Sequence, residues 1–359
     1  MEVFIDRCED YQNSQEVIED AFESLGGLEA YVKKGDTVLV NPNLLKASAP
    51  DQAVVTHPDF IISVVKELEK KDVDIIVGDS PAGRMTEKNL ENYYKKSGWH
   101  KIEEETTARL NYDVEASSRK VSSGRVTKEF KVMKVLDNVN VIVNLPKLKT
   151  HSLTVFTGAV KNKFGLVPGL TKAAHHGQFK RLNQFGRMLL DLNDAVTTDI
   201  TIMDGIVGME GKGPSGGDPV KLNCVIASKD ELAVDYAACK LTGIPPQKVP
   251  TLMANEAEFD DIDYINRSPN SFNIDIEYPS GGKTPFRVPH FLQDLFSNLY
   301  LDRPSLDKDK CVKCWECQEI CPKNAIKRKA YGPKISWWKC IRCYSCTEAC
   351  PEEALAPKS

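Results

Sequence analysis

The sequence predicts an α/β fold, built as a mostly parallel sheet with flanking helices and followed by a small C-terminal α+β domain. Two observations predict the sheet. Short apolar runs rich in Val and Ile alternate with segments of helical periodicity, and polar residues follow several of these runs. The separate small domain is predicted because eight of the eleven cysteines lie in the last fifty residues of this 359-residue chain. We therefore expect one domain at residues 1–300 and a second at 301–359.

The first strand, helix and second strand follow one another closely. A strand over 38–40 ends in Asn41-Pro42-Asn43, and a helix is expected from Pro58 to Lys71 because apolar residues recur on one of its faces. The preceding Thr56-His57-Pro58 offers a cap residue and a proline near the first turn. A second strand over 74–77 then runs into Gly78-Asp79-Ser80-Pro81. This order predicts two parallel strands joined by a helical crossover.

The middle of the chain is different. Residues 107–142 alternate in polarity around Ser122-Ser123-Gly124, which predicts a hairpin. Further elements are expected as apolar strands at 139–145, 200–204 and 222–227 and as a helix at about 178–196.

Two later helices complete the predicted large domain. One begins near Asp230, with Ser228 as its expected cap and Glu231 three residues on. The other, an amphipathic helix near 290–301 within a stretch rich in Pro, Gly and Ser, is expected to tether the C-terminal domain.

The cysteine spacing carries the most specific signal. Cys311, Cys314, Cys317 and Cys321-Pro322 form C-x2-C-x2-C-x3-C-P, and the same spacing returns at 340–351. This is the ligand run of a ferredoxin-type two-cluster domain, in which the fourth cysteine of each run serves the other [4Fe–4S] cluster. Zinc ribbons lack the third cysteine at this interval, and disulfides are disfavoured in a chain without an export signal. We expect one cluster to be held by Cys311, Cys314, Cys317 and Cys350, and the other by Cys340, Cys343, Cys346 and Cys321.

Charge is distributed unevenly. The chain has a formal net charge of −4, whereas residues 301–359 hold twelve Lys and Arg against eight Asp and Glu, a formal +4. An oxidised cubane with its four thiolates carries about −2, so the basic excess offsets the cluster charge. Nucleic-acid binding is therefore not expected. Neither a signal peptide nor eighteen continuous apolar residues are visible, and we expect a cytoplasmic protein without a membrane span.

Polar residues after the predicted strands are the candidates for chemistry, because open α/β sheets bind ligands at the carboxyl ends of their strands. The first group is Pro146-Lys147-Leu148-Lys149-Thr150-His151 with Lys161-Asn162-Lys163-Phe164-Gly165. Its lysines, His151 and Asn162 would attract a phosphate, a carboxylate or an enolate-like intermediate if they converge. A solvated basic loop is the alternative.

The second group is the glycine-rich run from Asp204 to Gly217, which could form an anion-binding nest. Asp204 and Glu210 within it could bind a metal or act as acid and base, and a flexible surface loop is the alternative. Weaker candidates are Asn41-Pro42-Asn43 with Thr56-His57-Pro58, the run from Gly78 to Gly83, and one member of the pair His175-His176. The three remaining cysteines, Cys8, Cys224 and Cys239, are expected in the core.

Taken together, these motifs resemble a known family. The residues that carry the resemblance are Asn41-Pro42-Asn43, Thr56-His57-Pro58, Gly78-Asp79-Ser80, Pro146 to His151, Lys161-Asn162 with Phe164-Gly165, and Asp204-Gly205 through Glu210-Gly211. The chain is similar to members of the domain of unknown function 362 family, many of which carry a C-terminal pair of [4Fe–4S] motifs. The resemblance covers nearly the whole chain and implies that residues 1–300 form one unit with a shared pocket. It implies no particular reaction.

Three functions are compatible with these features. In the first, an iron–sulfur oxidoreductase, two [4Fe–4S] clusters deliver electrons to an anionic substrate or cofactor held by Lys147, Lys149, His151, Lys161 and Asn162, while Asp204 or Glu210 moves protons. In the second, the chain is an electron-transfer or assembly subunit that docks a protein partner. In the third, the clusters are structural and the large domain is a non-redox enzyme. A redox partner protein or electron donor is expected, and an additional flavin, metal or organic cofactor is left open.

Overall fold

The structure is a computed structural model that describes residues 1–179, 181–255, 259, 261–279 and 303–358. The helix expected near 290–301 and the domain boundary expected at residue 300 lie outside these described residues. Both therefore stay predictions.

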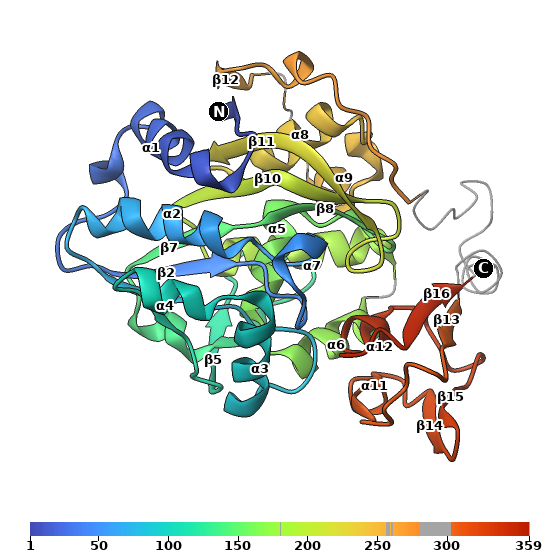
Figure 1. Ribbon diagram of the computed structural model, residues 1–359. Helices are drawn as coiled ribbons and strands as arrows, with labels where there is room; N and C mark the ends of the chain where they lie inside the picture. Colours follow the sequence, from blue (N-terminus) through green and yellow to red (C-terminus); the bar gives the residue numbers. More distant parts are fainter. Residues whose placement is uncertain (180, 256–258, 260, 280–302, 359) are drawn as a thin grey trace.

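One large sheet organises the first domain. Within the described residues its order is β12-β1-β11-β10-β7-β2-β3-β4, and β8 and β9 attach beside β10 (Figure 1). The run from β10 through β7, β2 and β3 to β4 is parallel throughout, which confirms the predicted mostly parallel sheet. The strands are β1 (Glu2–Arg7), β2 (Thr37–Pro42), β3 (Asp74–Val77), β4 (Arg109–Leu110), β7 (Val141–Leu145), β8 (Lys147–His151), β9 (Val155–Phe156), β10 (Ile200–Glu210), β11 (Asp218–Ser228) and β12 (Asp263–Asn266).

Both faces of the sheet are buried. In β2, Val38 and Val40 enter one apolar core while Leu39 enters another, because successive side chains of a strand point to opposite faces. Helices cover each face, as Figure 1 shows for α1 and α2 on one side and α5, α7 and α8 on the other. The helices are α1 (Ser14–Ser24), α2 (Pro58–Glu69), α3 (Glu87–Ser97) and α4 (His100–Glu105) against the first face, and α5 (Gly158–Asn162), α7 (Leu182–Ala195), α8 (Glu231–Thr242) and α9 (Pro250–Ala254) against the second.

Several local predictions are confirmed. Helix α2 begins at Pro58, and His57 caps it by accepting a hydrogen bond on Nδ1 from the N–H of Asp59 at 3.2 Å. The hairpin expected within 107–142 is formed by β5 (Ala116–Lys120) and β6 (Glu129–Met133), which pair antiparallel. Among the described residues no helix combines the length and the apolar composition needed to cross a membrane.

The glycine-rich run after Asp204 is a correction, because half of it is strand. Strand β10 continues to Glu210 and pairs with β11 along that length. A Cβ on Gly205 would lie 2.5 Å from Cys224 Sγ, and one on Gly208 would lie 2.4 Å from Leu222 Cδ1. These glycines therefore permit close packing between the strands, and only residues 211–217 remain as a loop.

Two details of the helices differ from expectation. The helix expected over about 178–196 is α7, which begins four residues later, at Leu182. An unpredicted helix, α6 (Gly169–Gln178), precedes it and ends where Phe179 leaves the helical conformation at φ −101° and ψ 73°. Helix α8 is capped by Asp230, whose side chain accepts from the N–H of Ala233 at 3.0 Å. The expected cap, Ser228, instead accepts from the N–H of Asp230 at 3.1 Å.

The C-terminal domain is small and internally repeated. Its elements are β13 (Arg303–Leu306), α11 (Glu316–Glu319), β14 (Ile326–Lys329), β15 (Gly332–Ile335), α12 (Ser345–Glu348) and β16 (Leu355–Lys358). β13 pairs with β16 and β14 with β15, both antiparallel. In Figure 1 this domain lies at the lower right, beside α6. Ile320 packs there with Ala82 and Ala173 of the first domain, so the two parts share an apolar contact.

Candidate functional site

A partly open cavity lies where the two domains meet. One wall comes from the chain that follows β2 and β3, a second from α5 and α6, and a third from the C-terminal domain. The lining residues are Asn43, Leu44, Leu45, Asp79, Ser80, Ala82, Lys161, Asn162, Phe164, Gly165, Gly169, Lys172, Ala173, His176, Ile320, Ser345 and Glu348. The carboxyl ends of parallel strands are where α/β sheets place their ligands, so the position agrees with the architecture.

Asparagines form the floor of this cavity. The Nδ2 of Asn162 donates to Asn144 Oδ1 at 2.8 Å, and its Oδ1 accepts from Asn43 Nδ2 at 2.9 Å. Asn43 in turn accepts from Lys149 Nζ at 2.7 Å. Lys149 is fully buried, does not line the cavity, and has a pKa well below its usual range because of burial and the nearby charge of Lys161. It therefore positions Asn43, which does line the cavity.

Lys161 is the cation that the cavity leaves available. No hydrogen bond or ion pair to another described residue holds its ammonium group, whereas Lys172 donates to the carbonyl oxygen of Ser80. Burial lowers the pKa of Lys161 to about 8, with Glu348 opposing that shift and Lys172 adding to it. At neutral pH the group is a poorly solvated cation, and such a group gains from a bound anion.

Asp79 is the acid on the opposite wall. Its carboxylate accepts from the N–H of Leu44 at 2.6 Å and from that of Ser80 at 2.9 Å. Burial raises its pKa to about 6, so it can give or take a proton near neutral pH. A Cβ on Gly165 would lie 1.8 Å from Asp79 Oδ1, which explains the glycine at that position.

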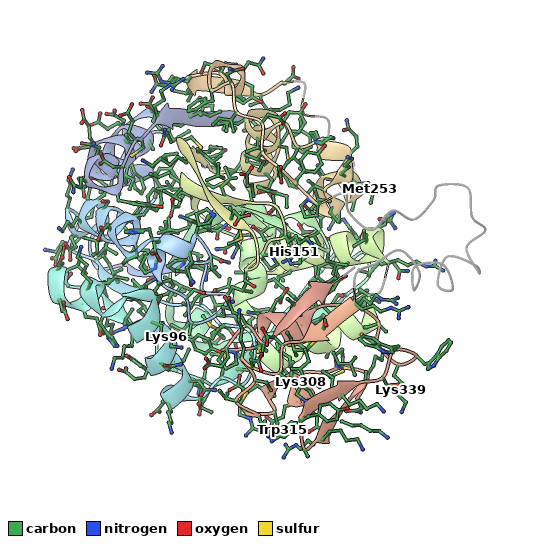
Figure 2. All side chains as sticks on the ribbon, turned by 45° about the vertical axis from the view of Figure 1, so that its right-hand side comes forward. Lys96, His151, Met253, Lys308, Trp315 and Lys339 are labelled. Atoms are coloured by element: carbon green, nitrogen blue, oxygen red, sulfur yellow. The ribbon has the colours of Figure 1, made fainter. Side chains whose placement is uncertain are left out.

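Glu348 reaches the cavity from α12 of the C-terminal domain. Its Oε1 lies 3.4 Å from Nε2 of His151, in a geometry poorer than that of a full hydrogen bond. The Nδ1 of His151 accepts from the N–H of Leu153 at 3.0 Å, so the ring proton sits on Nε2 and faces Glu348. Burial lowers the pKa of His151 to about 4 and keeps the ring neutral. Figure 2 labels His151, which lies where the two domains approach each other.

Ion pairs fix the two domains together around the cavity. Lys46 pairs with Glu353, and Arg84 lies 3.3 Å from Glu319. A Cβ on Gly177 at the end of α6 would lie 2.9 Å from Pro322, so the backbones approach closely there as well.

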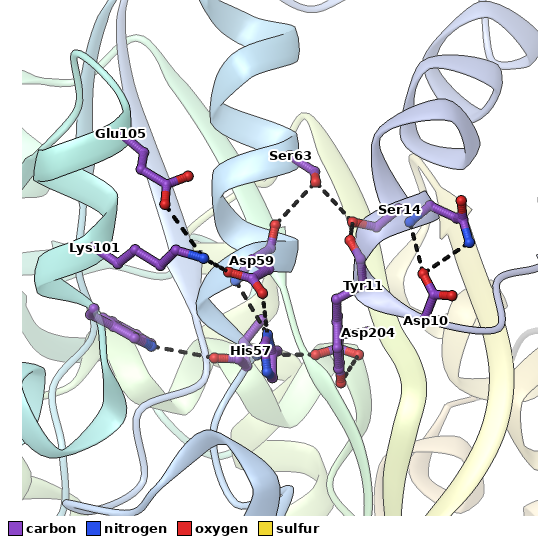
Figure 3. Close-up of polar contacts among 12 residues, drawn as sticks. Asp10, Tyr11, Ser14, His57, Asp59, Ser63, Lys101, Glu105 and Asp204 are labelled. Carbon is purple, nitrogen blue, oxygen red and sulfur yellow. Dashed lines mark hydrogen bonds and ion pairs between the residues drawn. The ribbon is translucent and has the colours of Figure 1, made fainter.

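Lys147 and Asp204 lie outside this cavity. They form a fully buried ion pair at 2.7 Å, and both also contact the hydroxyl of Tyr11. Figure 3 shows Tyr11 and His57 next to Asp204, with the His57 N–H donating to its carboxylate at 3.1 Å. These groups satisfy one another, so this pair holds strands β8 and β10 together.

Glu210 is also placed elsewhere. It ends β10, and its Oε2 accepts from the N–H of Glu277 at 2.9 Å. Of the main predicted candidates, Lys161 and Asn162 line the cavity, while Lys149 and His151 support it from behind. Phe164 and Gly165 of the same predicted group line it as well, and so do the weaker candidates Asn43, Asp79, Ser80, Ala82 and His176. Sequence reasoning missed Lys172 and Glu348 and gave Asp79 little weight. The signal that could have identified Asp79 was its position in Gly78-Asp79-Ser80-Pro81, directly after a predicted strand.

The cysteines surround two further cavities. One is lined by Cys311, Cys314, Cys317 and Cys350, and the other by Cys321, Cys340, Cys343 and Cys346. Each set combines three cysteines of one motif with the fourth of the other. Across the described residues, no three His, Cys, Asp or Glu side chains converge as a site for a single metal ion.

The backbone around both cysteine sets is curled in the same way. Lys313 and Trp315 have φ of 58° and 70°, and Arg342 and Tyr344, at the equivalent positions of the second motif, have 56° and 60°. These left-handed residues turn each loop so that its thiols face inward. Four thiols around a cavity are the donor set of an iron–sulfur cluster, so the residues present fit that group.

Comparisons with known proteins agree with both parts of the chain. Residues 38–240 match the family described as domain of unknown function (DUF362), and residues 303–351 match a 4Fe-4S dicluster domain. The thylakoid-associated protein sll1697 of Synechocystis sp. is 34% identical over 236 residues, which cover 65% of this chain and 71% of that protein. The solved lactate racemase apoprotein of Thermoanaerobacterium thermosaccharolyticum has a TM-score of 0.44 and 15% identity, over 67% of this chain and 57% of the racemase chain.

Proposed function

The chain belongs to the domain of unknown function 362 family and ends in a 4Fe-4S dicluster domain, and from this premise we propose that it is an iron–sulfur oxidoreductase acting on an anionic compound. The compound would bind in the cavity between the two domains. One observation carries the proposal: Ser345 lines that cavity and also the cavity of Cys321, Cys340, Cys343 and Cys346. A ligand beside Lys161 would therefore lie next to a cluster-binding site.

We assign one [4Fe–4S] cluster to each cysteine cavity. Cys311, Cys314, Cys317 and Cys350 would hold the first, and Cys340, Cys343, Cys346 and Cys321 the second. Two hydrogen bonds support thiolate ligands in both sets, because Cys321 and Cys350 each accept from a backbone N–H at 3.2 Å. Such clusters, when bound, supply single electrons.

The residues that line the cavity would bind the compound, orient it and exchange a proton with it. Lys161 would hold the anionic group, with the asparagine pair Asn43 and Asn162 fixing its orientation. Asp79 would exchange a proton with the compound as its charge changes, because its pKa of about 6 allows both protonation states near neutral pH. Ile320 and Glu348 close the cavity on the side of the C-terminal domain and limit the access of water. A cytoplasmic location remains our expectation.

Anaerobic purification of the full chain tests the proposal. We expect mass spectrometry of the denatured protein to find an organic anion at near-stoichiometric amount, together with iron and sulfide. Lys161→Met, treated identically, should yield the iron and sulfide but not the anion. If both proteins release iron and sulfide alone, and the reduced wild-type chain transfers no electrons to any small anion, the oxidoreductase proposal fails in favour of a partner-docking subunit.

The pH dependence of anion binding follows from the position of Lys161. Sulfate is a suitable probe because its charge is constant between pH 7 and pH 9. Lys161 loses its proton as the pH rises through about 8, so sulfate affinity should fall about tenfold between pH 7 and pH 9. Asp79 titrates below this range, and the other charges near Lys161 are those of Lys149, Lys172 and Glu348. Calorimetric titration measures the slope, which Lys161→Met should abolish.

A further inference from the structure

The charges of the C-terminal domain are unevenly placed. Three of its acidic residues, Glu319, Glu348 and Glu353, face Arg84, His151 and Lys46 of the first domain, while Asp307, Asp309 and Glu352 are exposed. By contrast, the stretch from Pro322 to Arg342 contains seven Lys and Arg and no acidic residue. Six of these seven are exposed: Lys323, Lys327, Arg328, Lys329, Lys334 and Lys339.

Most of these cations surround the hairpin formed by β14 and β15. Lys327 and Lys334 are direct cross-strand partners in it. Like charges opposite each other destabilise a hairpin, so this pair does not serve the fold. Arg328 points to the other face, where it lies over the ring of Trp315 at 5.2 Å and donates to Gln318 at 2.7 Å. The hairpin is thus anchored through Arg328, whereas no hydrogen bond or ion pair to another residue of the described chain engages Lys327, Lys329 or Lys334.

Exposed aromatic side chains accompany the cations. Trp338 is 95% exposed, and Trp337 and Tyr331 are exposed as well. Lys308 lies over the ring of Tyr331 at 5.3 Å, and Figure 2 shows Lys308, Trp315 and Lys339 on the C-terminal domain. Trp and Tyr are enriched where proteins bind other proteins, and clustered positive charge steers an acidic partner to such a surface.

The hairpin also lies directly over the cysteine cavities. Pro333 lines the cavity of Cys311, while Ile326 and Ile335 line that of Cys340. Trp338 is two residues before Cys340 in the chain. A protein bound to the hairpin would therefore lie close to both cavities.

We propose that the exposed lysines of the hairpin, Lys327, Lys329 and Lys334, together with Trp338 and Lys339 just after it in the chain, form a face that docks an acidic electron-carrier protein. The carrier would be oxidised by one electron and this chain reduced by one electron, with no bond made or broken. A lipid surface would use the same positive charge, but it would not account for the placement of the face over the two cavities. The inference rests on the proposed electron transfer and not on the anion cavity.

The test uses the full, cluster-loaded chain and a reduced flavodoxin, an acidic flavin-containing carrier. The double variant Lys327→Glu with Lys334→Glu is compared with Lys96→Glu, which changes an exposed lysine on α3 (Figure 2). We expect the double variant to lower the association rate at low ionic strength at least tenfold and to weaken its salt dependence. Lys96→Glu should stay within about twofold of wild type. Calorimetric binding of oxidised flavodoxin gives a readout that is independent of electron transfer.

The iron content of each variant serves as the control for correct folding. The milder double variant Lys327→Gln with Lys334→Gln should give a smaller loss of association rate in the same direction. Equal association rates and equal salt dependence for wild type and charge-reversed protein would overturn the proposal. So would loss of binding to phosphatidylglycerol vesicles without any change toward flavodoxin. Lys161→Met should leave flavodoxin binding intact, so failure of the anion cavity and failure of this surface are distinguishable.

Discussion

Cys350→Ala is expected to lower the iron content of the anaerobically reconstituted chain from about eight to about four atoms, because it removes one ligand of a single four-iron cluster. The cluster lost should be that of Cys311, Cys314 and Cys317, although Cys350 belongs to the second motif. The reason is geometric, since these four cysteines line one cavity. Cys239→Ala is the control: this cysteine is buried in α8, away from both cavities, and its loss should leave about eight iron atoms.

Double variants identify which cluster is lost. Cys350→Ala combined with Cys311→Ala should still retain about four iron atoms, because both changes damage the same cluster. Cys350→Ala combined with Cys340→Ala should retain almost none. The reverse result, with the first pair empty and the second half-loaded, would mean that each motif supplies all four ligands of its own cluster.

Lys161→Met is expected to weaken anion binding in the interdomain cavity by about ten- to a hundredfold, because a hydrogen bond to a charged group contributes about 1.5–3 kcal/mol. The substitution keeps an unbranched, flexible side chain that is one atom shorter, and it removes the ammonium group with its charge. No described residue depends on that charge for a hydrogen bond. The melting temperature should therefore equal or exceed that of the wild type, and the cluster spectra should not change.

We expect the opposite result for Lys163→Met, at a position two residues further along the chain: stability should fall, while anion binding in the cavity should not depend on this side chain. Lys163 is fully buried and pairs with Glu231 at 2.6 Å, and its removal leaves a buried carboxylate without its partner. Breaking such a pair costs about 3–5 kcal/mol, so this variant should lose stability. Sulfate titration and thermal unfolding of both variants distinguish a role of Lys161 in anion binding from a role in stability. If Lys161→Met is destabilised and binds sulfate normally, its role is structural.

The local pattern was enough to predict most of the fold. The apolar run at Val38 to Val40 and the capped helix from Pro58 depend on neighbours in sequence, and both were predicted correctly. The strands at 200–204 and 222–227 were predicted correctly, as parts of β10 and β11. Their extension into one long hairpin was missed, because its glycines are required by side chains on the partner strand, Cys224 and Leu222. A sequence shows the glycine but not the atom that needs the space.

The site was predicted only in part for a similar reason. Lys147, Lys149 and His151 alternate along β8 and were expected to converge on one ligand. A strand advances about 3.3 Å per residue, so alternate residues lie almost 7 Å apart. Their partners accordingly differ: Asp204 for the first, Asn43 for the second and Glu348 for the third. Glu348 comes from the other domain, and no local signal links it to His151.

The shared wall of the interdomain cavity would impose an order on the maturation of this protein. Ile320, Ser345 and Glu348 belong to the cysteine-rich domain. Because metal binding and folding are coupled in small cysteine-rich domains, these residues would take their places when the clusters are inserted. A newly made chain that has not received its iron would lack this wall of the cavity. Cluster insertion would then precede formation of the substrate-binding cavity, and a chain without metal would not bind the compound that it cannot reduce or oxidise.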